Sequence, residues 1–152
     1  MSTNTYAGTQ LSGVASTPAT NDQAGFEALT FITGGASLRQ VPSVGRTWNT
    51  VSEDLVDTET NTDVKASSKY KPMDFPVAIK PGDALHAVLR GLEEDRTAVG
   101  SFKLALPGDL GTIYVQAQVS MFDEIGGGGQ DAIVDANVQL LPQAKPIYVA
   151  AP

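Results

Sequence analysis

The sequence contains no cysteine, only one histidine and no long apolar run. Without cysteine there is neither a disulfide framework nor a thiolate site, and a reducing compartment is acceptable. Because His86 is the only histidine, a zinc site, which draws mainly on histidine and cysteine, is not expected. No apolar stretch approaches the length of a membrane span. The sequence therefore does not suggest a zinc protein, a thiol-based redox protein or a protein with a membrane-spanning helix.

Basic residues are also scarce relative to acidic ones. Asp and Glu number 17 against 10 Lys and Arg, which gives a net charge of −7 over 152 residues. A chain of this length is expected to form one domain with a substantial core. The acidic balance argues against binding of nucleic acid through phosphate neutralisation, although DNA could still pass nearby without adhering.

No catalytic constellation is found. There is no Gly-x-Ser-x-Gly sequence for a nucleophilic serine, and His86 beside a helix is expected to be a partly exposed edge residue. Glu93-Glu94-Asp95 follows the helix as a solvated end, and Asp123-Glu124 lacks the alternating oxygen ligands of a calcium loop. We therefore predict a protein that is not an enzyme and needs no metal or cofactor. Trp48 and Tyr114 could form a sugar-binding platform, but lone aromatic residues in strands are more often core residues.

Four consecutive glycines raise the question of a phosphate-binding loop. Apolar residues alternate with polar ones on both sides of the run, which is the period of a strand and not of the helix that a phosphate loop requires, and no Lys-Ser or Lys-Thr pair follows. The sequence therefore predicts a hairpin with a flexible glycine tip. The tip glycines are Gly126, Gly127, Gly128 and Gly129, and the apolar positions are Ile113, Val115, Ala117, Val119 and Met121 before them and Ala132, Val134, Ala136, Val138 and Leu140 after them.

Further strands and one helix are expected in the rest of the chain. The helix has a single apolar stripe at i, i+3, i+4 and i+7, with Pro81 in its first turn and Asp83 at the positive end of its dipole. The stripe consists of Leu85, Val88, Leu89 and Leu92. Expected strands are a short one with Leu29 and Phe31 that stops at Gly34-Gly35, Arg46 to Val51, Met73 to Ile79 with Pro76 suggesting an edge, and one with Phe102, Leu104 and Leu106. This pattern predicts a mainly β fold, a sandwich or half-barrel with one flanking α-helix.

Two segments do not fit a compact domain. Residues 1–25 are rich in Ser, Thr, Ala, Gly and Asn and lack the features of a signal peptide, so we expect either a disordered leader or a flexible N-terminal arm that orders against a neighbouring copy. Residues 52–71 are mostly polar, and such excursions are usually functional or disordered. They form either a solvated loop or a protruding hairpin with an acidic limb and a basic limb. The acidic residues are Glu53, Asp54, Asp57, Glu59 and Asp63, and the basic ones are Lys65, Lys69 and Lys71.

The order of these segments carries a family resemblance over roughly Phe26 to Val149. The matching parts are ALTFITGG, GRTWNTV, the polar excursion ending in Lys-Tyr-Lys, a strand with Pro-Gly-Asp and the helix, and the closing GGGGQDAIVDANVQLLPQAKPIYV. This layout resembles the major tail tube proteins of long-tailed, siphovirus-type bacteriophages. The match lies in layout and not in a short invariant signature.

The resemblance implies a fold, an assembly and a location. The fold would be the family's β-sandwich with a flanking helix, shared with the tube protein of type VI secretion, spanning residues 26–152 with a C-terminal extension. The function would be a structural virion protein whose hexameric rings stack into the hollow tail tube through which DNA reaches the host. The long excursion would contact the next ring, and the glycine tip would lie at a ring face.

The resemblance also implies partners. They would be further copies of the chain, a tape measure protein inside the tube, and tail terminator and distal tail proteins at its ends, with assembly in the host cytoplasm. Two alternatives stay open. One is another tail component of similar fold, such as a distal tail or tail-completion protein, and the other is a monomeric β-sandwich carbohydrate-binding module.

Overall fold

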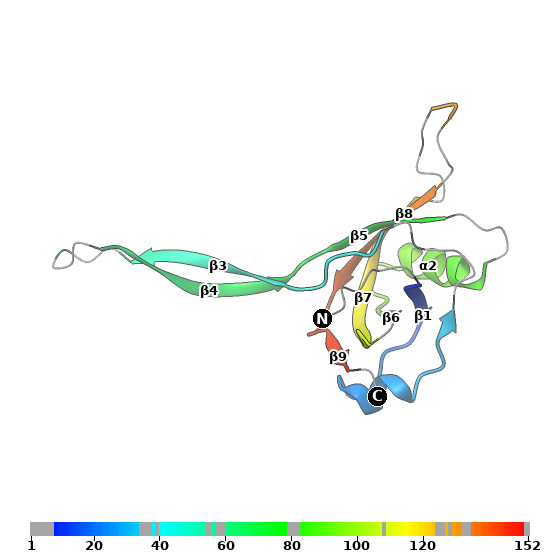
Figure 1. Cartoon of the computed structure of the whole chain (residues 1–152), viewed down its shortest axis with the longest axis horizontal. Coiled ribbons are helices and arrows are strands. Elements are labelled where there is room, and N and C mark those ends of the chain that lie inside the picture. Colours follow the sequence, from blue (N-terminus) through cyan, green and yellow to red (C-terminus); the bar gives the residue numbers. More distant parts are fainter. Residues whose placement is uncertain are drawn as a thin grey trace.

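The structure is a computed structural model of the 152-residue chain. It describes residues 8–33, 38, 40–53, 56, 60–78, 83–107, 109–123, 127, 129–131 and 135–150. The described chain has two parts, a body built on a seven-stranded sheet and a two-stranded hairpin that extends away from it (Figure 1). Among the described residues, neither helix is long and apolar enough to cross a membrane.

The sheet of the body is antiparallel throughout its described strands. Its order is β2-β1-β6-β7-β8-β5, and β9 pairs with β7 outside this path. The strands are β1 (Gln10–Val14), β2 (Ile32–Thr33), β5 (Met73–Ala78), β6 (Gly100–Ala105), β7 (Thr112–Asp123), β8 (Asp135–Pro142) and β9 (Ile147–Val149). The fold is thus mainly β, as the alternating patterns predict.

The strands on either side of the glycine run form the predicted hairpin. β7 pairs antiparallel with β8, from Ala117 opposite Pro142 to Asp123 opposite Asn137. Most of the predicted apolar positions face the core, with Val115, Ala117 and Val119 of β7 and Ala136, Val138 and Leu140 of β8 all buried. Met121 is the exception, because the register shifts after Val119 and Phe122 packs against the core instead. β8 begins at Asp135, and the expected earlier strand residues Ala132 and Val134 lie outside the described residues.

Of the four tip glycines, Gly127 and Gly129 are described. Gly127 has a φ of +80°, in the left-handed region that favours glycine, and a Cβ at either position would meet nothing within 4 Å. Gly126 and Gly128 lie outside the described residues. The run therefore supplies at least one backbone conformation that other residues rarely adopt.

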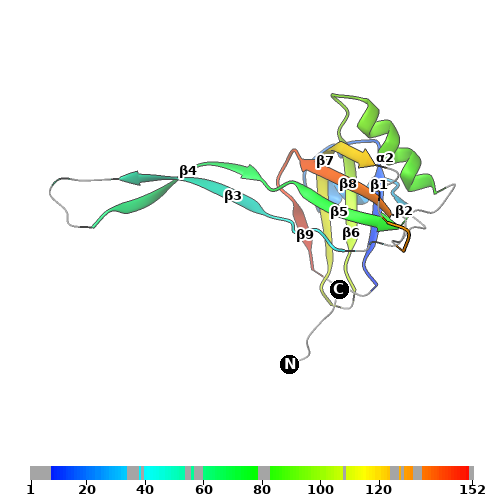
Figure 2. The ribbon, with the colours of Figure 1, turned by 90° about the horizontal axis from the view of Figure 1, so that it is seen from above.

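Helix α2 (Ala84–Glu94) covers one side of the sheet. The Asp83 carboxylate accepts a hydrogen bond of 3.0 Å from the Leu85 amide and so caps the helix N-terminus. The expected stripe faces the core, since Leu85, Leu89 and Leu92 are buried and Val88 packs against the same cluster. Figures 1 and 2 place α2 on the side of the body away from the hairpin.

Residues 1–25 were expected to form a flexible arm, but within the described part of this segment residues 10–14 form β1 of the body. β1 lies between β2 and β6, with Leu11 buried in the core, and the Ser101 hydroxyl donates a 2.6 Å hydrogen bond to the carbonyl of Ser16. Gly13 allows a close approach, because a Cβ there would lie 3.0 Å from the Phe102 ring. The segment contains few large apolar residues, so its place in the sheet is not visible in the sequence.

The strand expected around Leu29 and Phe31 is also different. The chain forms a short helix, α1 (Gln23–Glu27), and only Ile32–Thr33 pair as a strand; Gly34 and Gly35 lie outside the described residues. Phe26 is completely buried and stacks on Tyr114 with ring centroids 5.1 Å apart. Phe31 contacts the same ring at 5.9 Å. The apolar residues that suggest a strand thus cover the outer side of β7.

Candidate assembly surface

The second part of the molecule is the hairpin formed by β3 (Arg46–Glu53) and β4 (Thr62–Tyr70). Every residue of the two strands is exposed except Tyr70, which is half-buried. In the described chain β3 and β4 form a two-stranded sheet of their own, paired with each other (Figures 1 and 2). Of the two interpretations of residues 52–71, a solvated loop and a protruding hairpin, the structure shows the hairpin, and its strands begin earlier, at Arg46.

This hairpin carries most of the large apolar side chains that the described part of the chain exposes. Trp48 is 40% exposed, Val51 58% and Val64 47%, and Val56, between the strands, is fully exposed. Val51 lies directly opposite Val64, so the two form a cross-strand apolar pair on the surface. An isolated two-stranded hairpin is at best marginally stable in water. The hairpin therefore has the composition of a surface that a partner covers.

One face of the hairpin, here called the aromatic face, alternates aromatic rings with cations. The guanidinium carbon of Arg46 lies 5.4 Å from the centre of the Trp48 ring and 5.1 Å from that of Tyr70. The Lys65 ammonium lies 5.5 Å from Trp48. Arg46 also donates a 3.3 Å hydrogen bond to the Tyr70 hydroxyl. These contacts hold long cationic side chains in place on an exposed surface.

We expected one limb of the hairpin to be acidic and the other basic, but the structure does not divide the charges in this way. Glu53 is on β3 opposite Thr62, whereas Asp63 is on β4, the same strand as Lys65 and Lys69. The described acids thus lie at the ends of the strands farthest from the body, and the lysines lie nearer to it. Asp54, Asp57 and Glu59 lie outside the described residues, and in the sequence they fall between the two strands. Antiparallel pairing produces this order, because it folds the chain back on itself.

Hydrogen bonds at Lys71 and Asp63 link the two strands near the two ends of the hairpin. The Lys71 amide donates a 3.0 Å hydrogen bond to the carbonyl of Gly45, which closes the hairpin at the body. The Ser52 hydroxyl donates a 2.7 Å hydrogen bond to the Asp63 carboxylate near the other end. Between them, the register shifts after Trp48, where Asn49 donates a 2.9 Å hydrogen bond to the Ser67 hydroxyl. This irregularity is typical of a bulge, which increases the twist of a strand pair.

A pocket of about 380 Å³ lies where the hairpin joins the body. Arg46 and Tyr70 line it from the hairpin, Ile113 from β7, and Lys145, Pro146 and Tyr148 from the segment at β9. The Tyr148 hydroxyl donates a hydrogen bond to the carbonyl of Leu110. The sequence does not reveal this pocket, because its walls come from segments about a hundred residues apart.

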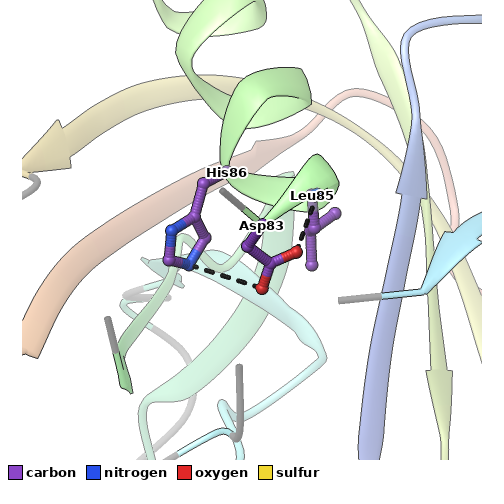
Figure 3. A network of polar contacts seen from close by, with 3 residues as sticks. All are labelled: Asp83, Leu85 and His86. Atoms are coloured by element: carbon purple, nitrogen blue, oxygen red, sulfur yellow. Dashed lines mark hydrogen bonds and ion pairs between the residues drawn. The ribbon is translucent and has the colours of Figure 1, made fainter. Parts of the chain in front are cut away.

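His86 is buried and not partly exposed as expected. Its ring packs against Phe122 of β7, with centroids 5.7 Å apart. Its Nε2 atom is 3.9 Å from the Asp83 carboxylate and has no hydrogen-bond partner (Figure 3). No group of three His, Cys, Asp or Glu residues that could hold a metal ion occurs in the described ranges. Next to a helix cap, this histidine is best explained as part of the packing of α2.

The possible sugar-binding pair is not formed. Trp48 is on the exposed hairpin, whereas Tyr114 is buried under Phe26 in the body. The two rings therefore do not share a surface on which a sugar could stack.

No protein-family model and no curated protein sequence matches this chain. Among solved structures, by contrast, similar folds are found. One is a chain in the cryo-EM structure of the anti-feeding prophage (AFP) baseplate, 6-fold symmetrised. The match has a TM-score of 0.67 and covers 95% of each chain, at 12% sequence identity. The chain therefore has the fold of that baseplate chain over nearly its whole length.

Proposed function

We propose that this protein is a structural virion protein whose copies form hexameric rings that stack into the hollow tail tube of a long-tailed bacteriophage. The observation that carries the proposal is the β3–β4 hairpin. It projects from the body with its strands exposed and presents Trp48, Val51 and Val64 to solvent. A hairpin of this kind is more stable when a neighbouring subunit covers its apolar side chains.

Two further observations support the same function. The fold is similar over 95% of the chain to a chain of a prophage baseplate described with six-fold symmetry. The net charge of −7 suits the wall of a channel for DNA, because a surface that repels phosphate does not retain the passing nucleic acid.

In this proposal the hairpin makes the contacts between rings. Its charged residues are the inter-ring candidates, namely Glu53, Asp54, Asp57, Glu59, Asp63, Lys65, Lys69 and Lys71. The glycine tip at residues 126–129 lies at a ring face. Tape measure protein fills the tube during assembly, and terminator and distal tail proteins close its two ends.

A second candidate is a component of the baseplate or tail end that forms one ring and not a tube. The observation that favours it is the similarity in fold to a chain that belongs to a baseplate. A tube protein forms many stacked rings, whereas such a baseplate or tail-end component forms only one.

Electron microscopy of a matched pair of proteins tests the proposal. One is the wild-type chain, and the other is a variant in which Asn-Gly replaces residues 49–67, so that the Trp48–Ser68 pair closes a short hairpin. We expect wild-type protein at high concentration to form long tubes, alone or with tail-initiating proteins. The shortened variant should keep the thermal stability of the body and form no tubes. Wild-type protein that stops at single rings would favour the baseplate component, and a strict monomer would exclude both.

A further inference from the structure

The pocket at the base of the hairpin is basic and partly apolar. Arg46 and Lys145 supply two cations, and no acidic residue is among the described residues that line the pocket. Tyr70, Tyr148 and Ile113 supply aromatic and aliphatic walls. Such a lining suits a ligand that combines carboxylates with small apolar groups.

The chain itself contains a segment of that chemistry. Residues 54–59, between β3 and β4, read Asp-Leu-Val-Asp-Thr-Glu. Three carboxylates thus flank the apolar pair Leu55 and Val56, and Val56 is fully exposed in the isolated chain. We call residues 54–59 the acidic tip. Its charge and its apolar pair complement the basic and apolar lining of the pocket.

We propose that the base pocket binds the acidic tip of a second copy of this chain. The proposal rests on the proposed function, since the contact would be the one that joins stacked rings. The copy must be a second one, because β3 alone spans eight residues, or roughly 25 Å of extended chain, between Arg46 at the pocket and Glu53 before the tip.

The aromatic face prepares the pocket for this ligand. Arg46 is fixed by its stacking on Trp48 and Tyr70 and by its hydrogen bond to the Tyr70 hydroxyl. A cation that is already ordered loses less conformational freedom when it meets a carboxylate. The three acids of the tip can therefore pair with Arg46 and Lys145 while Leu55 and Val56 contact the tyrosine rings.

The arrangement dictates the form of the assembly. Each chain has one acidic tip, which follows β3 in the sequence, and one pocket, which Arg46 at the start of β3 helps to line. A contact between different surfaces on identical chains is heterologous and continues from copy to copy unless a rotation closes it. Tip-to-pocket binding thus adds units in one direction, with the hairpin setting the distance between them.

Two complementary variants test the contact. In the tip variant, Asp54, Asp57 and Glu59 are each changed to Lys, and the pocket stays intact. In the pocket variant, Arg46→Glu and Lys145→Glu leave the tip intact. A control carries Arg90→Glu and Arg96→Glu, which make the same charge change at two exposed residues outside the pocket. The critical concentration for stacking should rise at least about tenfold in the tip and pocket variants and stay near wild type in the control.

Mixing the two variants gives the decisive result. The tip variant can still accept a tip, and the pocket variant can still donate one. We expect the 1:1 mixture to form pairs of units, rings or single chains, and to stop there, as measured by analytical ultracentrifugation. Unchanged stacking of each variant alone would overturn the proposal, as would a mixture that does not pair.

A peptide provides an independent readout. Trp48 is the only tryptophan of the chain and stacks on Arg46, so its fluorescence reports on the pocket. The probe is a peptide of residues 53–62, added to the tip variant, whose pocket is free of competing tips. We expect a saturable change in emission that a peptide with Asn, Asn and Gln at positions 54, 57 and 59 does not produce. Absence of any difference between the two peptides would overturn the proposal.

Failure of the tip–pocket contact can be told from failure of the proposed function. If wild-type protein forms tubes and the tip and pocket variants form them equally well, the tube stands and the tip–pocket contact does not. If variants pair in the mixture although wild-type protein never forms rings or tubes, the contact stands and the tube does not.

Discussion

The body and the hairpin are both built from antiparallel strands, yet they differ in what covers them. In β7 and β8 one face is apolar and buried, and α2 and α1 cover the sheet from its two sides. In β3 and β4 both faces are exposed, and polar, aromatic and charged residues alternate without an inner side. Backbone pairing alone therefore does not give a strand pair a buried face. The body buries its own apolar surface, whereas the hairpin leaves Trp48, Val51 and Val64 exposed in the isolated chain.

We expect the largest difference in stability between the two parts when an apolar residue of each is replaced by aspartate. Leu89 of α2 is completely buried, so Leu89→Asp creates an unpaired charge in the core and should cost several kcal/mol. The protein should unfold or become insoluble, as measured by circular dichroism and the soluble fraction. Val51→Asp on the exposed hairpin serves as the control and should leave the melting temperature nearly unchanged. A folded, soluble Leu89→Asp protein would contradict the packing of α2.

The next largest effect tests whether the N-terminal segment belongs to the body. Phe26 is completely buried against Tyr114, so Phe26→Ala should lower the free energy of unfolding by about 3–5 kcal/mol in urea titrations. Tyr148→Ala, at a residue that is 60% exposed, provides the comparison and should cost much less. Equal losses in the two variants would mean that α1 does not hold the outer side of β7.

A charge change on the hairpin should affect assembly and not folding. Lys65→Glu, Lys69→Glu and Lys71→Glu together alter exposed side chains, whose ion pairs contribute at most about 1 kcal/mol each. The melting temperature of the monomer should stay nearly the same, while tube growth followed by light scattering should slow strongly. High salt should restore part of the rate by screening like charges. An early melting transition would show that the hairpin supports the body.

The smallest effect is a pH dependence in the body. Hydrogen bonds from the Gly25 amide and then the Thr20 hydroxyl, both 2.8 Å, lower the pKa of Asp22 below its ordinary value of 3.8. The stabilisation is therefore fully present above that ordinary value and is lost as the pH falls through the lower folded-state pKa. Asp22→Ala should melt slightly earlier at neutral pH, and the difference from wild type should close in acid. A difference that persists unchanged at low pH would show that the carboxylate charge has no part in capping α1.

The sequence predicts most of the body where one face of an element is buried. The alternation in β7 and β8 and the stripe of α2 are direct consequences of burial on a single side, and both appear in the structure. It does not reveal β1, because Leu11 is the only large apolar side chain that β1 buries, nor α1, because Phe26 and Phe31 are equally compatible with a strand. Those elements depend on contacts with β6 and Tyr114, which lie 87 to 95 residues further along the chain.

For the candidate assembly surface, the sequence predicts which kinds of residue occur but not how they are arranged in space. The polar excursion and its ordered charges are visible in the sequence, but the pairing of Val51 with Val64 and the stacking of Arg46 between two rings follow from the register. The base pocket could not be predicted, because it forms only when Lys145 and Tyr148 return to the hairpin from the far end of the chain.

The origin of those pocket walls also sets an order of events in time. The hairpin joins residues that are at most 24 positions apart, and strand pairs of this kind form within microseconds. The sheet joins Gln10 to Ala105, and such long-range pairings form more slowly. Because Lys145, Pro146 and Tyr148 follow the hairpin by more than seventy positions, a growing chain has all the residues of its hairpin long before it has those of the pocket. With the proposed tip–pocket contact, a nascent chain can offer a tip before it can bind one, so we expect polymerisation to begin only after β9 has paired with β7.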